Sequence, residues 1–193
     1  MRLVRLSAVV GTGVVLAMVS GCGGDALSVG YDRSSDTSEY KTVRSQEAFG
    51  GEWPEDYQQS AVLADGRKVF LWYSRGGSKL MEQHYSPLAK AWTSPHVVHV
   101  SGEADPCQGI EIVERDGVVA VIADFGTYCY DGEPPSDSLA VVSAGDLTDW
   151  KVDATPGFDG WAEVAVNDAD TVTWRGSGES LTWSPSEGFS GGV

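Results

Sequence analysis

The sequence predicts an all-β fold of three repeated antiparallel β-meanders, each of about 51 residues, in a propeller-like arrangement. The first observation behind this prediction is that turn-forming residues between β-branched runs recur at positions 65, 116 and 168. The second is that each hairpin is followed by a further apolar run, a Ser-containing turn and an aromatic residue. The third is that no window longer than about ten residues has the 3.6-residue apolar period of an amphipathic helix.

The middle hairpin is the clearest of the three. Asp116 and Gly117 separate an alternating run at 110–114 from an apolar run at 118–123. An Asp-Gly pair between two such runs favours a type I′ turn, because both residues accept positive φ angles. The second run is apolar enough to be buried on both of its faces.

Strand pairing about this turn brings Cys107 and Cys129 together at the open end of the hairpin. A disulfide closing this loop of about 22 residues is expected to stabilise the fold by roughly 3 kcal/mol. The alternative is a metal site, but the two cysteines with His84, His96 and His99 match no zinc spacing. His96 and His99 are expected on opposite faces of a regular strand. We therefore expect neither a metal nor a cofactor.

The other two hairpins surround Asp65-Gly66 and residues 167–170, and the domain is expected to span residues 42–193. Its repeats are placed near residues 60–100, 108–152 and 160–190. Three units are fewer than the four to eight blades of a usual propeller. Residues 42–59 would then complete the last sheet, or the sheets would form a three-sheet stack, or a ring would close by association. An antiparallel β-sandwich with coincidental hairpin spacing is the alternative fold.

The N-terminus carries Arg2 and Arg5, an apolar run at 6–19, and the sequence Val-Ser-Gly-Cys ending at Cys22. This segment resembles the signal of a bacterial lipoprotein. The resemblance implies that residues 1–21 are a signal peptide and that Cys22 becomes lipidated. An apolar run of about 14 residues is also short for a membrane span. Residues 22–41, which contain little to bury, are expected to form the lipidated cysteine and a flexible tether.

These features predict an extracytoplasmic protein, lipid-anchored to the cell membrane through Cys22, in a compartment where a disulfide persists. The formal net charge of −15 repels nucleic acid, so no nucleic-acid partner is expected. With 41% hydrophobic residues and seven Trp, the chain can bury a core and is not expected to be disordered.

Residues 143–150 read Ser-Ala-Gly-Asp-Leu-Thr-Asp-Trp. This stretch is similar to the Asp-box turn of sialidase-like β-propeller repeat proteins. In that family the motif is a structural turn on a blade, so the resemblance implies a fold and not an activity.

Catalytic chemistry is weakly supported by the sequence. A glycosidase needs two carboxylates about 5 to 10 Å apart. Candidates are Glu111, Asp124, Asp131 and Glu163, but a chain with 28 acidic residues supplies such candidates by chance. The Gly-x-Ser-x-Gly pattern of a serine nucleophile is also missing from the sequence. We therefore expect no catalytic residues.

Two aromatic–cationic segments occupy equivalent places after two of the hairpins. They contain the candidate ligand contacts Trp72, Tyr73, Arg75, Trp174 and Arg175. An indole beside a guanidinium can hold a sugar ring or a peptide, whereas the alternative is that both tryptophans pack between sheets. The sequence favours a non-catalytic binding module of the cell envelope, with an envelope glycan or protein as ligand. A glycosidase-like enzyme of reduced propeller form and an envelope protein that neutralises a toxin or phage component are the alternatives.

Overall fold

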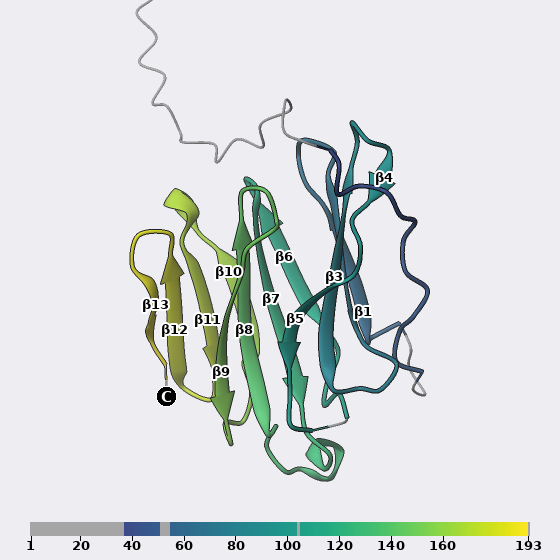
Figure 1. Cartoon of the computed structure of the whole chain (residues 1–193). Helices are drawn as coiled ribbons and strands as arrows, with labels where there is room; N and C mark the ends of the chain where they lie inside the picture. Colours follow the sequence, from purple (N-terminus) through teal and green to yellow (C-terminus); the bar gives the residue numbers. More distant parts are fainter. Residues whose placement is uncertain (1–36, 51–54, 104, 193) are drawn as a thin grey trace, which may run out of the picture.

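The computed structural model describes residues 37–50, 55–103 and 105–192. These residues form three antiparallel sheets, none of which closes into a barrel. The sheets stand side by side in chain order (Figure 1). Within the described ranges, no helix has the length and apolar character needed to cross a membrane. Cys22 and residues 23–36 lie outside the described residues, so lipidation stays a prediction. Residues 37–41, the end of the predicted tether, are described, and the Lys41 N–H donates a hydrogen bond to the Trp92 carbonyl at 3.0 Å.

Sheet A comes first. Its strands are β1 (Gln58–Val62), β2 (Lys68–Tyr73), β3 (Lys79–Ser86), β4 (Ala91–Trp92) and β5 (His96–Val100). The first three strands form a meander, and β4 and β5 both pair with β3.

Sheets B and C are four-stranded meanders. Sheet B contains β6 (Glu111–Arg115), β7 (Val118–Phe125), β8 (Asp137–Ala144) and β9 (Trp150–Pro156), with the 3-10 helix η1 (Cys129–Asp131) between β7 and β8. Sheet C contains β10 (Glu163–Val166), β11 (Val172–Gly176), β12 (Glu179–Ser184) and β13 (Gly188–Gly191), with the 3-10 helix η2 (Asp168–Asp170) between β10 and β11.

The predicted middle hairpin is confirmed. Strands β6 and β7 pair with Arg115 opposite Val118, and Asp116 and Gly117 have φ angles of 53° and 85°. Two positive φ angles are what a type I′ turn requires. The predicted disulfide between Cys107 and Cys129 is also confirmed, with the two Cα atoms 5.6 Å apart.

Sheet B is the middle layer of the stack. Every residue of β7 is buried, because its two faces enter two different cores. Val119 and Val121 pack with Leu71 of sheet A in the core between sheets A and B. Ala120 and Ile122 belong to the core that sheet B forms with sheet C. The predicted burial of this strand on both faces is therefore confirmed.

The first strands of the three sheets lie closest to one another. Strand β6 contacts both β1 and β10, and β10 also contacts β7. Sheet B therefore meets sheet C along the side of the stack on which the sheets begin, and it meets sheet A both there and where β5 contacts β9.

The outer face of sheet A is apolar and covered. Phe70 and Trp72 stack on this face with ring centroids 4.9 Å apart, and the Arg44 guanidinium lies 4.3 Å from the centre of the Phe70 ring. The side-chain amide of Gln83, on the same face, accepts a hydrogen bond from the Ser45 N–H and donates one to the Val43 carbonyl. This N-terminal stretch therefore covers sheet A and does not complete the last sheet.

The outer face of sheet C is polar. Thr173 pairs with Thr182, and Arg175 pairs with Ser180. Thr182, Arg175 and Ser180 are exposed. The apolar side chains of the same strands point the other way, into the core shared with sheet B.

Candidate functional site

A cavity of about 980 Å³ opens beside the junction of sheets A and B. Its walls are residues 38–41, residues 93–96 and residues 146–148, together with Glu82 and His84 of β3. The first two wall segments flank sheet A, and the third belongs to the β8–β9 turn of sheet B. The cavity is thus assembled from parts of the chain that are distant in sequence.

Strand periodicity places Glu82 and His84 at this junction. In β3 they alternate with Met81 and Gln83, so both point to the same face of sheet A as Leu80, which belongs to the core against sheet B. Both side chains are buried, with 2% exposure for Glu82 and 5% for His84.

The two side chains form a tight pair. His84 Nδ1 lies 2.7 Å from Glu82 Oε1. Nδ1 can donate this hydrogen bond to the carboxylate both in the neutral imidazole and in the imidazolium. Nε2 is shielded from solvent and has no hydrogen-bond partner. Tyr40, from the cavity wall, packs its ring edge-on against the imidazole at a centroid distance of 5.4 Å.

Opposing effects act on the pKa of the Glu82 carboxyl. Burial raises the pKa of Glu82, and the hydrogen bond and charge of His84, the charge of His96 and a hydrogen bond with Trp150 work against this rise. Trp150 belongs to β9, and its indole N–H also lies 3.0 Å from the Leu147 carbonyl. Glu82 therefore connects sheet A with the β8–β9 turn of sheet B.

That turn brings a second carboxylate to the cavity. Asp146 accepts hydrogen bonds from the Thr148 N–H at 3.0 Å and the Thr148 hydroxyl at 2.7 Å. Although burial alone would raise the pKa of Asp146, these bonds and the charge of His84 lower it below its usual value. Asp146 is therefore ionised at neutral pH. The residue lies in the segment that resembles an Asp box.

The turn is anchored from both sides. Leu147 adopts a positive φ of 68° and is fully buried in the core between sheets A and B. Arg67, from the β1–β2 turn, donates a hydrogen bond to the Gly145 carbonyl and binds Asp65 Oδ2 at 2.7 Å. Arg67 is 1% exposed, so it connects the two sheets from a buried position.

His96 and His99 face the same side of sheet A, and the expectation of opposite faces is wrong. His96 pairs with Glu82 and His99 pairs with Leu80, with a register shift between the two pairs. The bulge adds one residue to β5, which cancels the alternation between them. His96 consequently lines the cavity, whereas His99 packs near Phe125 at a centroid distance of 5.9 Å.

The structure separates the predicted ligand contacts into two groups. Trp72, Tyr73 and Trp174 are buried, with exposures of 2%, 0% and 0%, whereas Arg75 and Arg175 are exposed. The Trp174 indole donates a hydrogen bond to the Val121 carbonyl at 3.0 Å. Trp174 therefore packs between sheets B and C, as in the alternative that the sequence left open, whereas Trp72 stacks on Phe70 on the outer face of sheet A.

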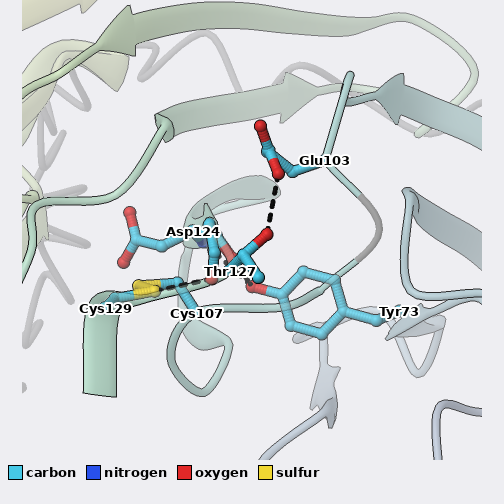
Figure 2. Close-up of a disulfide and its surroundings, with 7 residues drawn as sticks. Tyr73, Glu103, Cys107, Asp124, Thr127 and Cys129 are labelled. Atoms are coloured by element: carbon cyan, nitrogen blue, oxygen red, sulfur yellow. Dashed lines mark hydrogen bonds between the residues drawn. A yellow bond between two sulfur atoms is a disulfide. The ribbon is translucent and has the colours of Figure 1, made fainter. Parts of the chain in front are cut away.

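Tyr73 has a second structural role close to the disulfide. Its hydroxyl donates a hydrogen bond to the Asp124 carbonyl at 3.1 Å and accepts one from the Asp124 N–H at 2.9 Å. Figure 2 shows the ring reaching toward β7 beside Cys107 and Cys129. This contact joins sheet A to sheet B at the end of the stack opposite the hairpin turns.

The four carboxylates considered for glycoside hydrolysis do not line the cavity. Glu111 and Glu163 are exposed on β6 and β10, and Asp124 is buried in β7. Asp131 lies at a second cavity of about 590 Å³, together with Glu103 and Glu133. The sequence reasoning missed Glu82 as a site residue. The available signal was the pair of polar residues alternating with apolar ones in 80–84.

In the ranges that the structure describes, no group of three or more His, Cys, Asp or Glu residues is arranged to hold a metal ion. The chain matches no known protein-family model, and a comparison with curated proteins finds no significant relative.

Proposed function

We propose that the protein is an exported lipoprotein, anchored at the cell membrane through Cys22, whose folded domain is a non-catalytic binding module with its ligand site in the cavity between sheets A and B. The observation that carries the proposal is the buried Glu82–His84 pair at the cavity wall, with one imidazole nitrogen left without a partner.

Burying a carboxylate and an imidazole together costs folding free energy, and a role in binding would explain why the fold keeps them. Removing a carboxylate and an imidazole from water carries a desolvation penalty that apolar residues of similar size would avoid. A buried polar atom without a partner costs a further 1 to 3 kcal/mol, roughly. Perturbed titratable groups beside a cavity of this size are typical of binding sites. A bound ligand that reaches His84 Nε2 would recover part of this cost.

The arrangement favours binding over nucleophilic catalysis. An imidazole that activates a serine or threonine needs the hydroxyl within hydrogen-bond reach of its second nitrogen. His84 Nε2 has no such contact. The Thr148 hydroxyl is engaged with Asp146, and the Thr93 hydroxyl accepts a hydrogen bond from the His84 backbone N–H at 3.1 Å.

The propeller-like prediction is part of this proposal. Three meanders in chain order, with β6 in contact with both β1 and β10, support an open fan of three blades. The cavity lies at the junction of two neighbouring units. The envelope location is supported by the lipoprotein-like residues 1–22 and by the acidic composition.

The test uses the full chain in detergent, incubated with solubilised envelope proteins and with purified wall glycan. Two variants with the same substitution distinguish the cavities: Ser94→Trp narrows the cavity at the A–B junction, and Ser136→Trp narrows the second cavity. Both serines are exposed, so neither substitution disturbs a core.

We expect wild type and Ser136→Trp to retain the same partner and Ser94→Trp to lose it. Equal retention by all three proteins would place the binding site elsewhere. Release of free sugar from the glycan, abolished by Glu82→Gln, would instead favour the enzyme alternative.

A further inference from the structure

We propose that the outer face of sheet A docks on an anionic lipid bilayer, the membrane to which Cys22 anchors the chain. The contact is made at the end of the sheet where β1 and β3 finish, by a rim patch of six residues: Val62, Lys68, Tyr85, Leu88, Lys90 and Trp92. This inference rests on the proposed anchorage of Cys22, but it assigns a surface separate from the cavity, since none of the six lines that cavity.

Strand pairing places four side chains of the rim patch in a row on one face. Val62 of β1 pairs with Lys68 of β2, and Lys68 pairs with Tyr85 of β3. Tyr85 in turn pairs with Trp92 of β4. Directly opposed residues of antiparallel strands point to the same face. Lys68 lies two residues before Phe70 in β2, so the row belongs to the outer face of sheet A.

The row combines apolar, aromatic and cationic side chains. Val62 is 63% exposed, and Leu88, in the turn between β3 and β4, is 49% exposed. The half-buried rings of Tyr85 and Trp92 lie 5.5 Å apart between centroids. The Lys68 ammonium lies 5.3 Å from the centre of the Tyr85 ring. Aromatic residues beside lysines and exposed aliphatic side chains are typical of surfaces that enter the interface of a bilayer.

The first described residues of the chain lie beside the rim patch. Thr42 forms a β-bridge with Trp92, and the Lys41 N–H donates a hydrogen bond to the Trp92 carbonyl at 3.0 Å. Thr37 follows Cys22 by 15 residues, and a chain of that length spans at most about 50 Å. A lipid on Cys22 therefore holds the patch close to the membrane surface, at a high effective concentration.

The charge of the chain is distributed so that sheet A is the part an anionic bilayer repels least. Residues 37–100 contain seven basic and seven acidic residues, a net formal charge of zero. Residues 101–193 contain three basic and 18 acidic residues, a net formal charge of −15. Anionic lipids attract exposed lysines and arginines and repel carboxylates. The bilayer is thus expected to orient the domain with sheet A toward the lipid and sheets B and C away from it.

The carboxylates around the rim patch do not outweigh its cations. Glu39 and Glu47 are exposed on the first segment, whereas Asp65 is paired with a buried arginine at 2.7 Å. Asp116 and Asp168, in the hairpin turns of sheets B and C, are exposed and repel lipid from that end of the stack. The outer side of sheet A, along which residues 37–50 run in Figure 1, is therefore the face expected to meet the bilayer. Its exposed cations are Lys41, Arg44, Lys68 and Lys90.

The experiment measures the reactivity of individual lysines in the lipidated chain, recovered from the membrane in detergent and reconstituted in vesicles. The vesicles contain phosphatidylcholine alone or phosphatidylcholine with one third phosphatidylglycerol. An amine-reactive label is applied, and mass spectrometry gives the labelling rate at each lysine.

We expect Lys68 and Lys90 to be labelled about fivefold more slowly on the anionic vesicles, the gain that one lysine near an anionic surface supplies. High salt should reduce this protection. Lys151 is the internal control, because it lies on β9 of sheet B with 54% exposure, and its labelling rate should be the same on both vesicles.

A matched pair of variants tests the patch itself. Leu88→Asp places a carboxylate in the rim patch and is expected to return the labelling of Lys68 on anionic vesicles to the rate on phosphatidylcholine. Tyr128→Asp makes the same change at a 66% exposed residue after β7 of sheet B. It is expected to leave the protection of Lys68 unchanged.

Flotation of the chain with the vesicles separates this inference from the proposed function. A chain that floats with the vesicles, but whose Lys68 and Lys90 react equally fast on both lipids, would overturn the docking and leave the anchor standing. A chain that does not float would remove the anchor and the docking together. Protection that appears on phosphatidylcholine as the protein concentration rises would assign the patch to a second copy of the chain and overturn the lipid contact.

Discussion

The two junctions of the stack are filled in different ways. Between sheets B and C the core contains Trp161, Trp174 and Trp183 packed on small residues of β7 and β8. Between sheets A and B the core is made of aliphatic residues, two tyrosines and Phe125, and the same junction also receives the polar pair Glu82 and His84. The cavity of about 980 Å³ opens beside this A–B junction.

This difference has its origin in residue size along β11 and β12. Each Trp buries a large apolar surface in one step, so apolar packing dominates the junction of sheets B and C, where Asp124 and Ser138 are also buried. Sheet A places a paired carboxylate and imidazole, Glu82 and His84, at its own junction with sheet B. In the proposed function, the B–C junction contributes stability and the A–B junction also holds the ligand site.

The largest expected effect on stability is at the junction of sheets B and C. Trp174→Ala removes a fully buried side chain and its hydrogen bond to the Val121 carbonyl. We expect a loss of about 3 to 5 kcal/mol in the free energy of unfolding, measured by urea denaturation. Thr182→Ala, on the exposed face of the same sheet, is the control and should change stability by less than about 0.5 kcal/mol. Similar costs for the two variants would contradict the role given to this junction.

The next effect concerns a buried carboxyl on the side of β7 that faces sheet C. Burial raises the pKa of Asp124 from 3.8 to about 6, and a hydrogen bond with Ser138 opposes the rise. The folded protein therefore holds a proton between about pH 4 and pH 6 that the unfolded chain has released. The stability that this protonation gives is complete below about pH 4 and is lost as the pH rises through about 6.

Asp124→Asn removes this titration. The stability of the variant relative to wild type is expected to increase by up to about 3 kcal/mol between pH 4 and pH 7.5. Thermal unfolding of both proteins across this pH range gives the measurement. A difference that is independent of pH would mean that Asp124 is not the titrating group.

The smallest effects compare two arginines that connect neighbouring sheets. Arg67 joins sheets A and B from a buried position, so Arg67→Met should cost about 2 kcal/mol. Arg115 joins sheets B and C through Asp168 at 2.7 Å, with half of its side chain exposed, so Arg115→Met should cost less than about 1 kcal/mol. Urea denaturation of both variants at low and at high salt measures these two losses in the free energy of unfolding. The reverse order would show that exposure does not govern these links.

The parts of the fold that were predictable rest on local signals. The Asp116-Gly117 turn has its own backbone preference, and it sets the register of β6 and β7 and hence the approach of Cys107 and Cys129. The three hairpins were visible for the same reason. The turn residues and the runs beside them predict each hairpin without information from distant parts of the chain.

The site was not predictable in this way. The single extra residue in β5 that turns His96 toward Glu82 leaves no mark in the local sequence. The cavity also needs residues 38–41 and 146–148 to meet, which depends on how the first segment crosses sheet A. Trp72 and Trp174 look alike in sequence, yet Trp174 packs against sheet B whereas Trp72 lies on the outer face of sheet A.

The two outer faces have a consequence for how the number of repeats can change. Arrays of stacked units need end caps that tolerate water. Here the first cap is a segment folded over Phe70, and the last is the polar face around Thr182 and Arg175. Neither end offers an apolar surface for a further unit. A longer array would therefore arise by duplicating the middle unit, whose two apolar faces match a neighbour on either side.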